Sequence, residues 1–137
     1  MSADAQWALQ QAVFAALGAD ATLKALLGDP ARIYDHVPPA SPFPYLVLGE
    51  ATSGGFDAKT EDGMEQTLTL HTWSRSRGLK ETKQIMAAVV AALDDRALGV
   101  TGHTLVLLRF EFGTTALETD GLTRHGVQRF RAITQVV

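Results

Sequence analysis

The sequence predicts an α+β fold in which a mainly antiparallel sheet of four to five strands has helices packed on one face. Apolar residues recur at intervals of three and four between residues 79 and 93, which is typical of an amphipathic helix. They alternate with polar residues in segments such as 65–74, which is typical of a strand. Strands joined mostly by short or moderate connections favour antiparallel pairing, so we expect the order α-α-β-β-β-α-β-β.

A chain of 137 residues is long enough for one domain with one core, and we assign residues 1–137 to a single domain. Two helices are expected at its start. The first covers residues 5–17, with Trp7 and Phe14 on a stripe beside the buried one. The second covers residues 20–27 and ends at a turn that contains glycine and proline.

Proline dominates the approach to the first long strand. Four of the five prolines fall between residues 38 and 44, in the segment VPPASPFPYLVLGE at 37–50, which follows a short extended piece at 32–37. Proline cannot donate to a strand ladder, so we expect a stiff segment outside the sheet that leads into a strand at 45–50. Such a segment either enters an interface between copies at a low ordering cost or protects an edge strand from unwanted pairing. The sequence leaves both interpretations open.

The remaining elements follow in order. The polar, glycine-bearing stretch at 51–63 is expected to be a long loop or the tip of a hairpin. Asp120 and Gly121 form a turn signal between the last two strands and predict a hairpin. The strands and the helix after the loop are expected at residues 65–74, 79–93, 103–112 and 123–136.

Strand alternation divides the sheet residues into two sets. The first set is apolar and is expected to face the helices: Leu46, Leu48, Leu68, Leu70, Val106, Leu108, Phe110, Phe130 and Ala132. The second set mixes charged, aromatic and apolar side chains: Tyr45, His71, Trp73, Leu105, Leu107, Arg109, Val127, Arg129, Arg131 and Ile133. A half-apolar outer face suggests a surface that meets a partner.

The composition narrows the classes of function. A net charge of −3 gives no general attraction to nucleic acid, whose dedicated binders carry a basic face. The chain has no cysteine, so disulfides and thiolate metal sites are excluded. The N-terminus lacks the pattern of a secretory signal, and no apolar run approaches the ~20 residues that span a bilayer. We expect a soluble protein with no membrane partner.

The residues show no catalytic motif. The four histidines do not stand at metal-ligand spacing, and the sequence has neither a nucleophile elbow nor a phosphate-binding loop. We therefore assign no catalytic, cofactor-binding or metal-binding residue and expect a protein that is not an enzyme. One enzymatic alternative stays open, because His71, Arg109 and Glu111 lie on or near one sheet surface that a small ligand pocket would need.

Charge is unevenly distributed along the chain. Residues 50–65 carry five acidic side chains against one lysine, whereas residues 75–83 carry four basic side chains against one glutamate. These are either solvated faces or the two halves of a contact between copies, and a contact between two different surfaces closes into a ring when the rotation allows. The residues expected at such an interface are Phe56, Asp57, Lys59 and Glu61 in the loop, and Trp73, Arg75 and Arg77 at the strand-to-helix junction.

Five segments support a family resemblance. They are RIYDHVP at 32–38, FPYLVLGE at 43–50, LTLHTWS at 68–74, LVLLRFE at 105–111 and DGLTRHGVQRFRA at 120–132. In this order and spacing they resemble the small phage tail-completion proteins, also called tail terminators, of tailed phages and gene transfer agents. The resemblance covers nearly the whole chain.

The resemblance implies a structural virion protein that needs no cofactor. Members of this family form rings, usually hexameric, that cap the head-proximal end of the tail tube, stop its polymerisation and join it to the head. The implied partners are other copies, the tail tube protein and a head-tail connector or head-closure protein, with DNA passing through the channel without specific binding. The implied location is the bacterial cytoplasm during assembly and then the head–tail junction of the particle. Another ring adaptor, such as a head-closure or connector protein, is the alternative.

Overall fold

The computed structural model describes residues 5–55 and 63–137. The predicted α+β class and the predicted order of elements are both confirmed. The elements are α1 (Ala5–Ala19), α2 (Ala21–Leu27), β1 (Ile33–Tyr34), β2 (Tyr45–Gly55), β3 (Gly63–Ser74), α3 (Lys80–Leu93), β4 (His103–Leu117) and β5 (Arg124–Val136).

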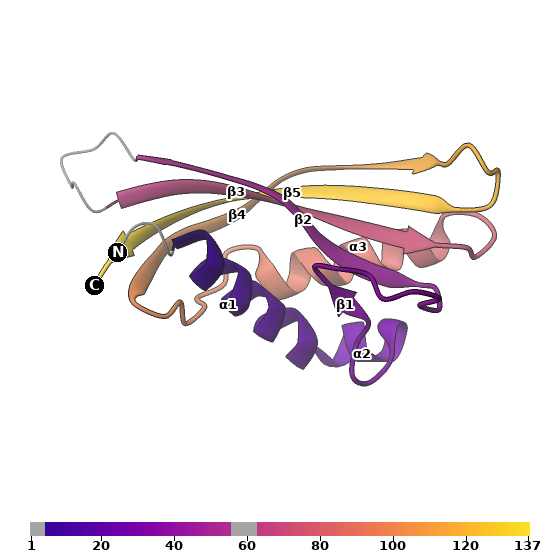
Figure 1. Cartoon of the computed structure of the whole chain (residues 1–137), viewed down its shortest axis with the longest axis horizontal. Coiled ribbons are helices and arrows are strands. Elements are labelled where there is room, and N and C mark those ends of the chain that lie inside the picture. The colour runs from indigo at the N-terminus through magenta and orange to yellow at the C-terminus, as the bar shows by residue number, and fades with distance from the viewer. Residues whose placement is uncertain (1–4, 56–62) are drawn as a thin grey trace.

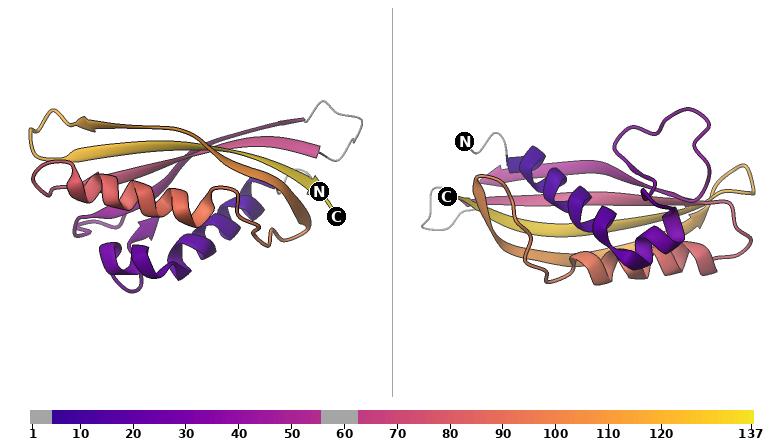
Figure 2. Two further views of the ribbon diagram at one scale, coloured as in Figure 1. Left: turned by 180° about the vertical axis from the view of Figure 1, so that it is seen from behind. Right: turned by 90° about the horizontal axis from the view of Figure 1, so that it is seen from below.

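The strands form one sheet in the order β1-β2-β3-β5-β4. Neighbouring strands are antiparallel, except that the short β1 runs parallel to β2. The central strands β3 and β5 pair along their whole length, from Gly63 opposite Gln135 to Ser74 opposite Arg124. The three helices lie on one face of this sheet, and no described helix covers the other face (Figure 1 and Figure 2). We call these the inner and the outer face.

Local signals explain where the helices begin and end. Asp20 caps α2 by accepting a hydrogen bond from the Leu23 backbone N–H at 2.9 Å, and Gly28 ends the helix with a φ of 93°. The first helix runs to Ala19, two residues past its predicted end, because the glycine at position 18 is tolerated inside the last turn. None of the described helices is both long enough and apolar enough to cross a membrane.

The core lies between the helices and the inner face. Phe130 and Leu70 from the central strands are completely buried, as are Ile85 and Val89 from α3. Burying a side chain of this size contributes about 1.5–3 kcal/mol. A buried amide also joins the two layers, since Gln128 donates from Nε2 to a backbone carbonyl of α3 at 2.9 Å.

One member of the predicted inner set faces the solvent. Val106 is 57% exposed, because the pairing of β4 with β5 shifts by one residue between Leu105 and Leu107. A bulge of this kind turns the following residues to the opposite face. Leu105, which was expected on the outer face, packs against the core instead. A second shift around Glu111 restores the original alternation.

Part of the segment 51–63, which was predicted as a loop, is strand. Residues 51–55 continue β2 and pair with β3, although their small and polar side chains have little intrinsic preference for strands. Pairing with β3 therefore holds these residues in a strand that their own sequence does not favour. The hairpin predicted at Asp120 is confirmed, and β4 extends five residues past its predicted end to reach it.

The proline-rich segment lies outside the sheet, as predicted. It connects β1 to β2 as a loop that projects past the edge of the sheet (Figure 2). Ser41 donates from its hydroxyl to the hydroxyl of Tyr34 at 3.0 Å, and the Phe43 ring lies 5.0 Å from the ring of Tyr45. These contacts hold the loop against the beginning of β2.

Candidate interaction surface

The outer face of the sheet is mixed in character, as predicted. Its basic residues come mainly from β4 and β5, where Arg109 lies opposite Arg131 in the ladder. Most of this charge is neutralised locally. Arg129 lies 3.0 Å from Glu111, Arg131 pairs with Glu65, and the three arginines therefore do not form an unbalanced basic stripe.

Four residues at the other end of the outer face form a hydrogen-bonded chain. His71 on β3 lies 2.5 Å from Glu50 through Nε2 and 2.7 Å from His125 through Nδ1. His125 on β5 lies 3.2 Å from Glu118 through its own Nδ1. We call Glu50, His71, His125 and Glu118 the histidine chain. Trp73 covers it, with its ring 3.7 Å from that of His125 and an angle of 11° between the planes.

The histidine chain requires more N–H donors than two neutral imidazoles carry. Its three contacts each need one N–H, whereas two neutral imidazoles supply only two. All three contacts are satisfied when one of the two rings carries hydrogens on both nitrogens and the other carries one. Burial lowers the pKa of His125, which favours its neutral form, and the hydrogen bond from His71 lowers the pKa of Glu50.

A close approach of backbone to ring holds His71 in place. The pairing of β2 with β3 shifts between Leu48 and Ala51, so two residues of β2 face one residue of β3 there. One of the two is Gly49, and a Cβ at this position would lie 2.7 Å from the His71 ring. The other is Glu50, which accepts the hydrogen bond from that ring. The bulge therefore both admits the imidazole and supplies its partner.

The sequence-predicted interface residues have different positions in the structure. Phe56, Asp57, Lys59 and Glu61 lie outside the described residues. Trp73 is half-buried against His125 rather than free. Arg75 and Arg77 are exposed at the strand-to-helix junction, as expected.

Arg75 has a structural role in addition to its exposure. Its guanidinium lies 4.4 Å from the centre of the Phe43 ring, and its Nε donates to the Thr123 hydroxyl at 3.1 Å. It thus joins the proline-rich segment to the hairpin between β4 and β5. Asp120 shapes that hairpin by accepting from the backbone of Leu122 and Thr123, each at 2.8 Å.

The ligand pocket considered from the sequence is not assembled. His71 lies level with Thr114 of β4 in the ladder, whereas Arg109 lies level with Thr67 of β3, near the other end of the sheet. Glu111 pairs with Arg129 rather than with either of them. Within the described residues, no group of three or more histidines and carboxylates is placed to hold a metal ion.

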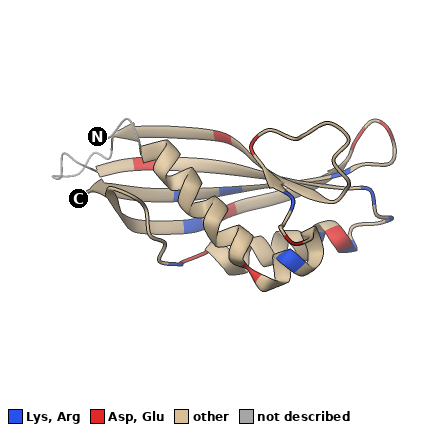
Figure 3. Cartoon of the chain, turned by 60° about the horizontal axis from the view of Figure 1, so that its bottom comes forward, with Lys and Arg blue, Asp and Glu red and all other residues tan. Residues whose placement is uncertain are grey.

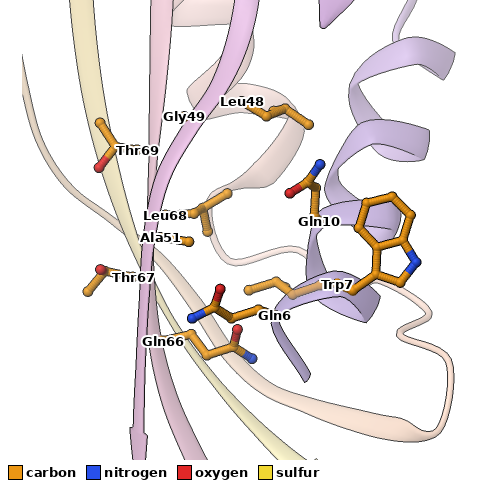
Figure 4. A pocket seen from close by; sticks show the side chains of 11 residues that line it. Gln6, Trp7, Gln10, Leu48, Gly49, Ala51, Gln66, Thr67, Leu68 and Thr69 are labelled. Carbon is orange, nitrogen blue, oxygen red and sulfur yellow. The ribbon is translucent and has the colours of Figure 1, made fainter. Parts of the chain in front are cut away.

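A hollow of about 250 Å³ lies between α1 and β2 on the inner face (Figure 4). Gln6, Trp7 and Gln10 line it from the helix, and Gln66 lies on its floor. None of its lining residues titrates near neutral pH, so it offers no acid or base. Trp7 is 57% exposed beside it, and Figure 3 shows that α1 carries no charged residue.

Sequence reasoning missed the histidine chain. A signal for it exists, because residues 71 and 125 both have the alternation of the outer face. The missing information was the register, which places Trp73 opposite His125 and therefore puts the two histidines diagonally adjacent.

These features define a class of protein. A small α+β unit with one face closed by helices and one mixed face left open to neighbours is typical of a subunit of a larger assembly. The sequence matches the family described as "Tail completion protein gp17" over residues 11–135. The chain belongs to this family, and the recognition made from the sequence is confirmed.

Individual relatives agree with the family assignment. The Tail completion protein gp17 of Bacillus phage SPP1 is 31% identical over 90 residues, which span 66% of this chain and 66% of that protein, just under two thirds. The solved structure of bacteriophage SPP1 gp17 matches with a TM-score of 0.63 at 25% identity, over 91% of this chain and 87% of that one. A chain from the virion of a native gene transfer agent particle matches with a TM-score of 0.87 at 31% identity, over 96% of this chain and 97% of that one.

Proposed function

We propose that this protein is the tail-completion subunit of a phage-like particle. Copies of it form a ring, most simply a hexamer, that caps the head-proximal end of the tail tube, stops its polymerisation and joins it to the head connector. The observation that carries the proposal is the match to a chain of a gene transfer agent virion, which spans 96% of this protein and 97% of that chain. The match extends over nearly the whole length of both chains, which supports a shared role.

The surface chemistry supports this role. A subunit of a DNA conduit should not hold phosphate strongly, because each strong contact slows passage. The arginines of the outer face are paired with carboxylates, as Arg129 is with Glu111, so they present little free positive charge. The protein acts through its surfaces rather than by catalysis, and it assembles in the cytoplasm before it becomes part of the particle.

Deleting the gene from cells that produce the particles tests the proposal. Electron microscopy of the particles is expected to show tails that are overlong or not joined to heads, and the wild-type gene supplied on a plasmid is expected to restore joined tails. Normal tails attached to heads in the deletion strain would contradict the proposal. Ring symmetry follows from averaged images of the head–tail junction, in which six-fold density is expected.

A further inference from the structure

Two stretches of strand lie at the edges of the sheet without a described neighbour. β1 borders β2 only at Leu46 and Val47, so residues 51–55 have β3 on one side and no strand on the other. Residues 112–117 of β4 likewise pair only with β5. We call these the open β2 edge and the open β4 edge. They lie on opposite sides of the sheet and at opposite ends of it (Figure 1).

Other parts of the same two strands have hydrogen-bond partners on their outer side. The backbone N–H of Phe110 donates to the Asp94 carboxylate at 2.8 Å, and the N–H of Asp95 donates to the Leu108 carbonyl at 2.8 Å. The segment after α3 therefore satisfies the middle of β4. At the start of β2, the N–H of Leu46 donates to the Arg32 carbonyl at 3.0 Å. Within the described residues, none of these contacts extends to the open β2 edge or to the open β4 edge.

The open edges also lack the residues that usually prevent strands from pairing with other chains. Edge strands of soluble proteins carry lysines, prolines or inward-pointing charges at such positions. The open β2 edge reads ATSGG and the open β4 edge reads FGTTAL, with no charge and no proline in either. Each offers a row of backbone donors and acceptors that an added strand can satisfy.

The directions of the strands indicate which chain is added. β2 is antiparallel to β3, β3 to β5 and β5 to β4, so β2 and β4 run in opposite directions. When two copies lie side by side in the same orientation, the open β2 edge of one therefore meets the open β4 edge of the next as an antiparallel pair. Both halves of this contact belong to the same chain, which favours a second copy as the added strand.

We propose that the open β2 edge of one copy pairs with the open β4 edge of the next, so that the sheet continues from subunit to subunit. This contact joins different surfaces and repeats around an axis, as a ring requires. It deepens the proposed function and rests on it. The outer faces of successive subunits then form one continuous wall.

The direction of each backbone N–H along β4 identifies a substitution that affects only the open β4 edge. The N–H of Glu118 donates to the Thr123 carbonyl at 2.8 Å, which fixes residue 118 as one whose backbone points towards β5. Because direction alternates along an antiparallel strand, the N–H of Thr114 points towards β5 and the N–H of Thr115 points to the open edge. Thr115→Pro therefore removes a donor that only an added strand would use, whereas Thr115→Val keeps it.

The first experiment supplies Thr115→Pro or Thr115→Val to the deletion strain. Purified Thr115→Pro is expected to keep the wild-type circular dichroism spectrum but to give unjoined or overlong tails, while Thr115→Val is expected to restore joined tails. Normal particles from a folded Thr115→Pro protein would overturn the edge pairing.

A cysteine pair tests the contact directly and does not depend on the proline variant folding. The chain has no cysteine of its own. Chains carrying Ser53→Cys with either Thr114→Cys or Thr115→Cys are assembled into particles, oxidised and separated without reductant. We expect covalent multimers of this chain with at least one of the two pairs, and none with the control pair of Ser53→Cys and Thr104→Cys.

A second cross-linking experiment distinguishes failure of the edge pairing from failure of the proposed ring. A lysine-directed cross-linker applied to the same particles reports contact between copies regardless of its location. Multimers from that reagent without any from either cysteine pair would overturn the edge pairing and leave the ring intact. Absence of multimers with both methods would overturn the ring and the edge pairing together.

Discussion

The carboxylate of Asp94 gives the most direct test of how this sheet closes its edge. It accepts a hydrogen bond from the Phe110 backbone N–H at 2.8 Å, but it also lies at the C-terminal end of α3, where a negative charge opposes the helix dipole. Loss of a hydrogen bond to a charged group costs about 1.5–3 kcal/mol. The lower end applies here, because the side chain is 39% exposed and water reaches the freed N–H.

Relief of the dipole opposes this loss. Removing an unfavourable charge from the last helical turn gains about 0.3–1 kcal/mol. Asp94→Ala is therefore expected to lower the free energy of unfolding by about 1 kcal/mol. Asp94→Asn keeps an acceptor for the N–H and removes the charge, so its stability is expected to stay within about 0.5 kcal/mol of the wild type.

Urea denaturation followed by circular dichroism measures both variants. With a slope of about 2 kcal/mol per molar urea, the midpoint of Asp94→Ala is expected about 0.5 M below that of the wild type. Arg109→Ala is the matched control for the exposed ion pair to the same carboxylate, at 4.0 Å, and is expected to change little. Wild-type stability in Asp94→Ala, or an equal loss in Asp94→Asn, would refute the reasoning.

Three further predictions concern the outer face and the hairpin. Burial places the pKa of His125 below its ordinary value of 6.5, so at lower pH the unfolded chain binds more protons than the folded one. The urea midpoint is therefore expected to fall as the pH drops from 7.5 to 5.5, and His125→Gln is expected to weaken this dependence. An unchanged dependence in His125→Gln would contradict the lowered pKa. Gly49→Ala is expected to lower the free energy of unfolding by about 1–3 kcal/mol, because the added Cβ would collide with the His71 ring. In a His71→Ala background the loss is expected to be clearly smaller, and equal losses in both backgrounds would exclude the collision. The pKa of Asp120 is lowered to about 2 by hydrogen bonds from the Thr123 N–H, the Thr123 hydroxyl and the Leu122 N–H. An NMR titration of the carboxyl carbon of Asp120 is expected to show this value. A pKa near 3.8 would disprove these hydrogen bonds in solution.

Locally encoded features were predictable from the sequence. The capping of α2 depends on Asp20 and the hairpin depends on Asp120, and each acts on residues two or three positions away. The core stripe of α3 follows from spacing along one helix, and its buried members include Ile85, Val89 and Leu93. These features need no knowledge of which strand lies beside which.

Features that depend on strand register were not predictable in the same way. Val106 was assigned to the core because alternation was extended through a bulge that nothing in the local sequence marks. The strand at residues 51–55 exists because β3 pairs with it, and His71 meets His125 only in the observed pairing of β3 with β5. A single residue of slip changes the face of every later side chain, so such errors spread along a strand.

The composition of the two open edges has a consequence for the hydration of the free subunit. In a free subunit, the backbone N–H and C=O groups of these edges bind water, which an added strand would have to displace. Small uncharged side chains such as Ser53 and Thr115 lose little hydration when they are covered. Covering either edge would therefore remove no charged side chain of that edge from water.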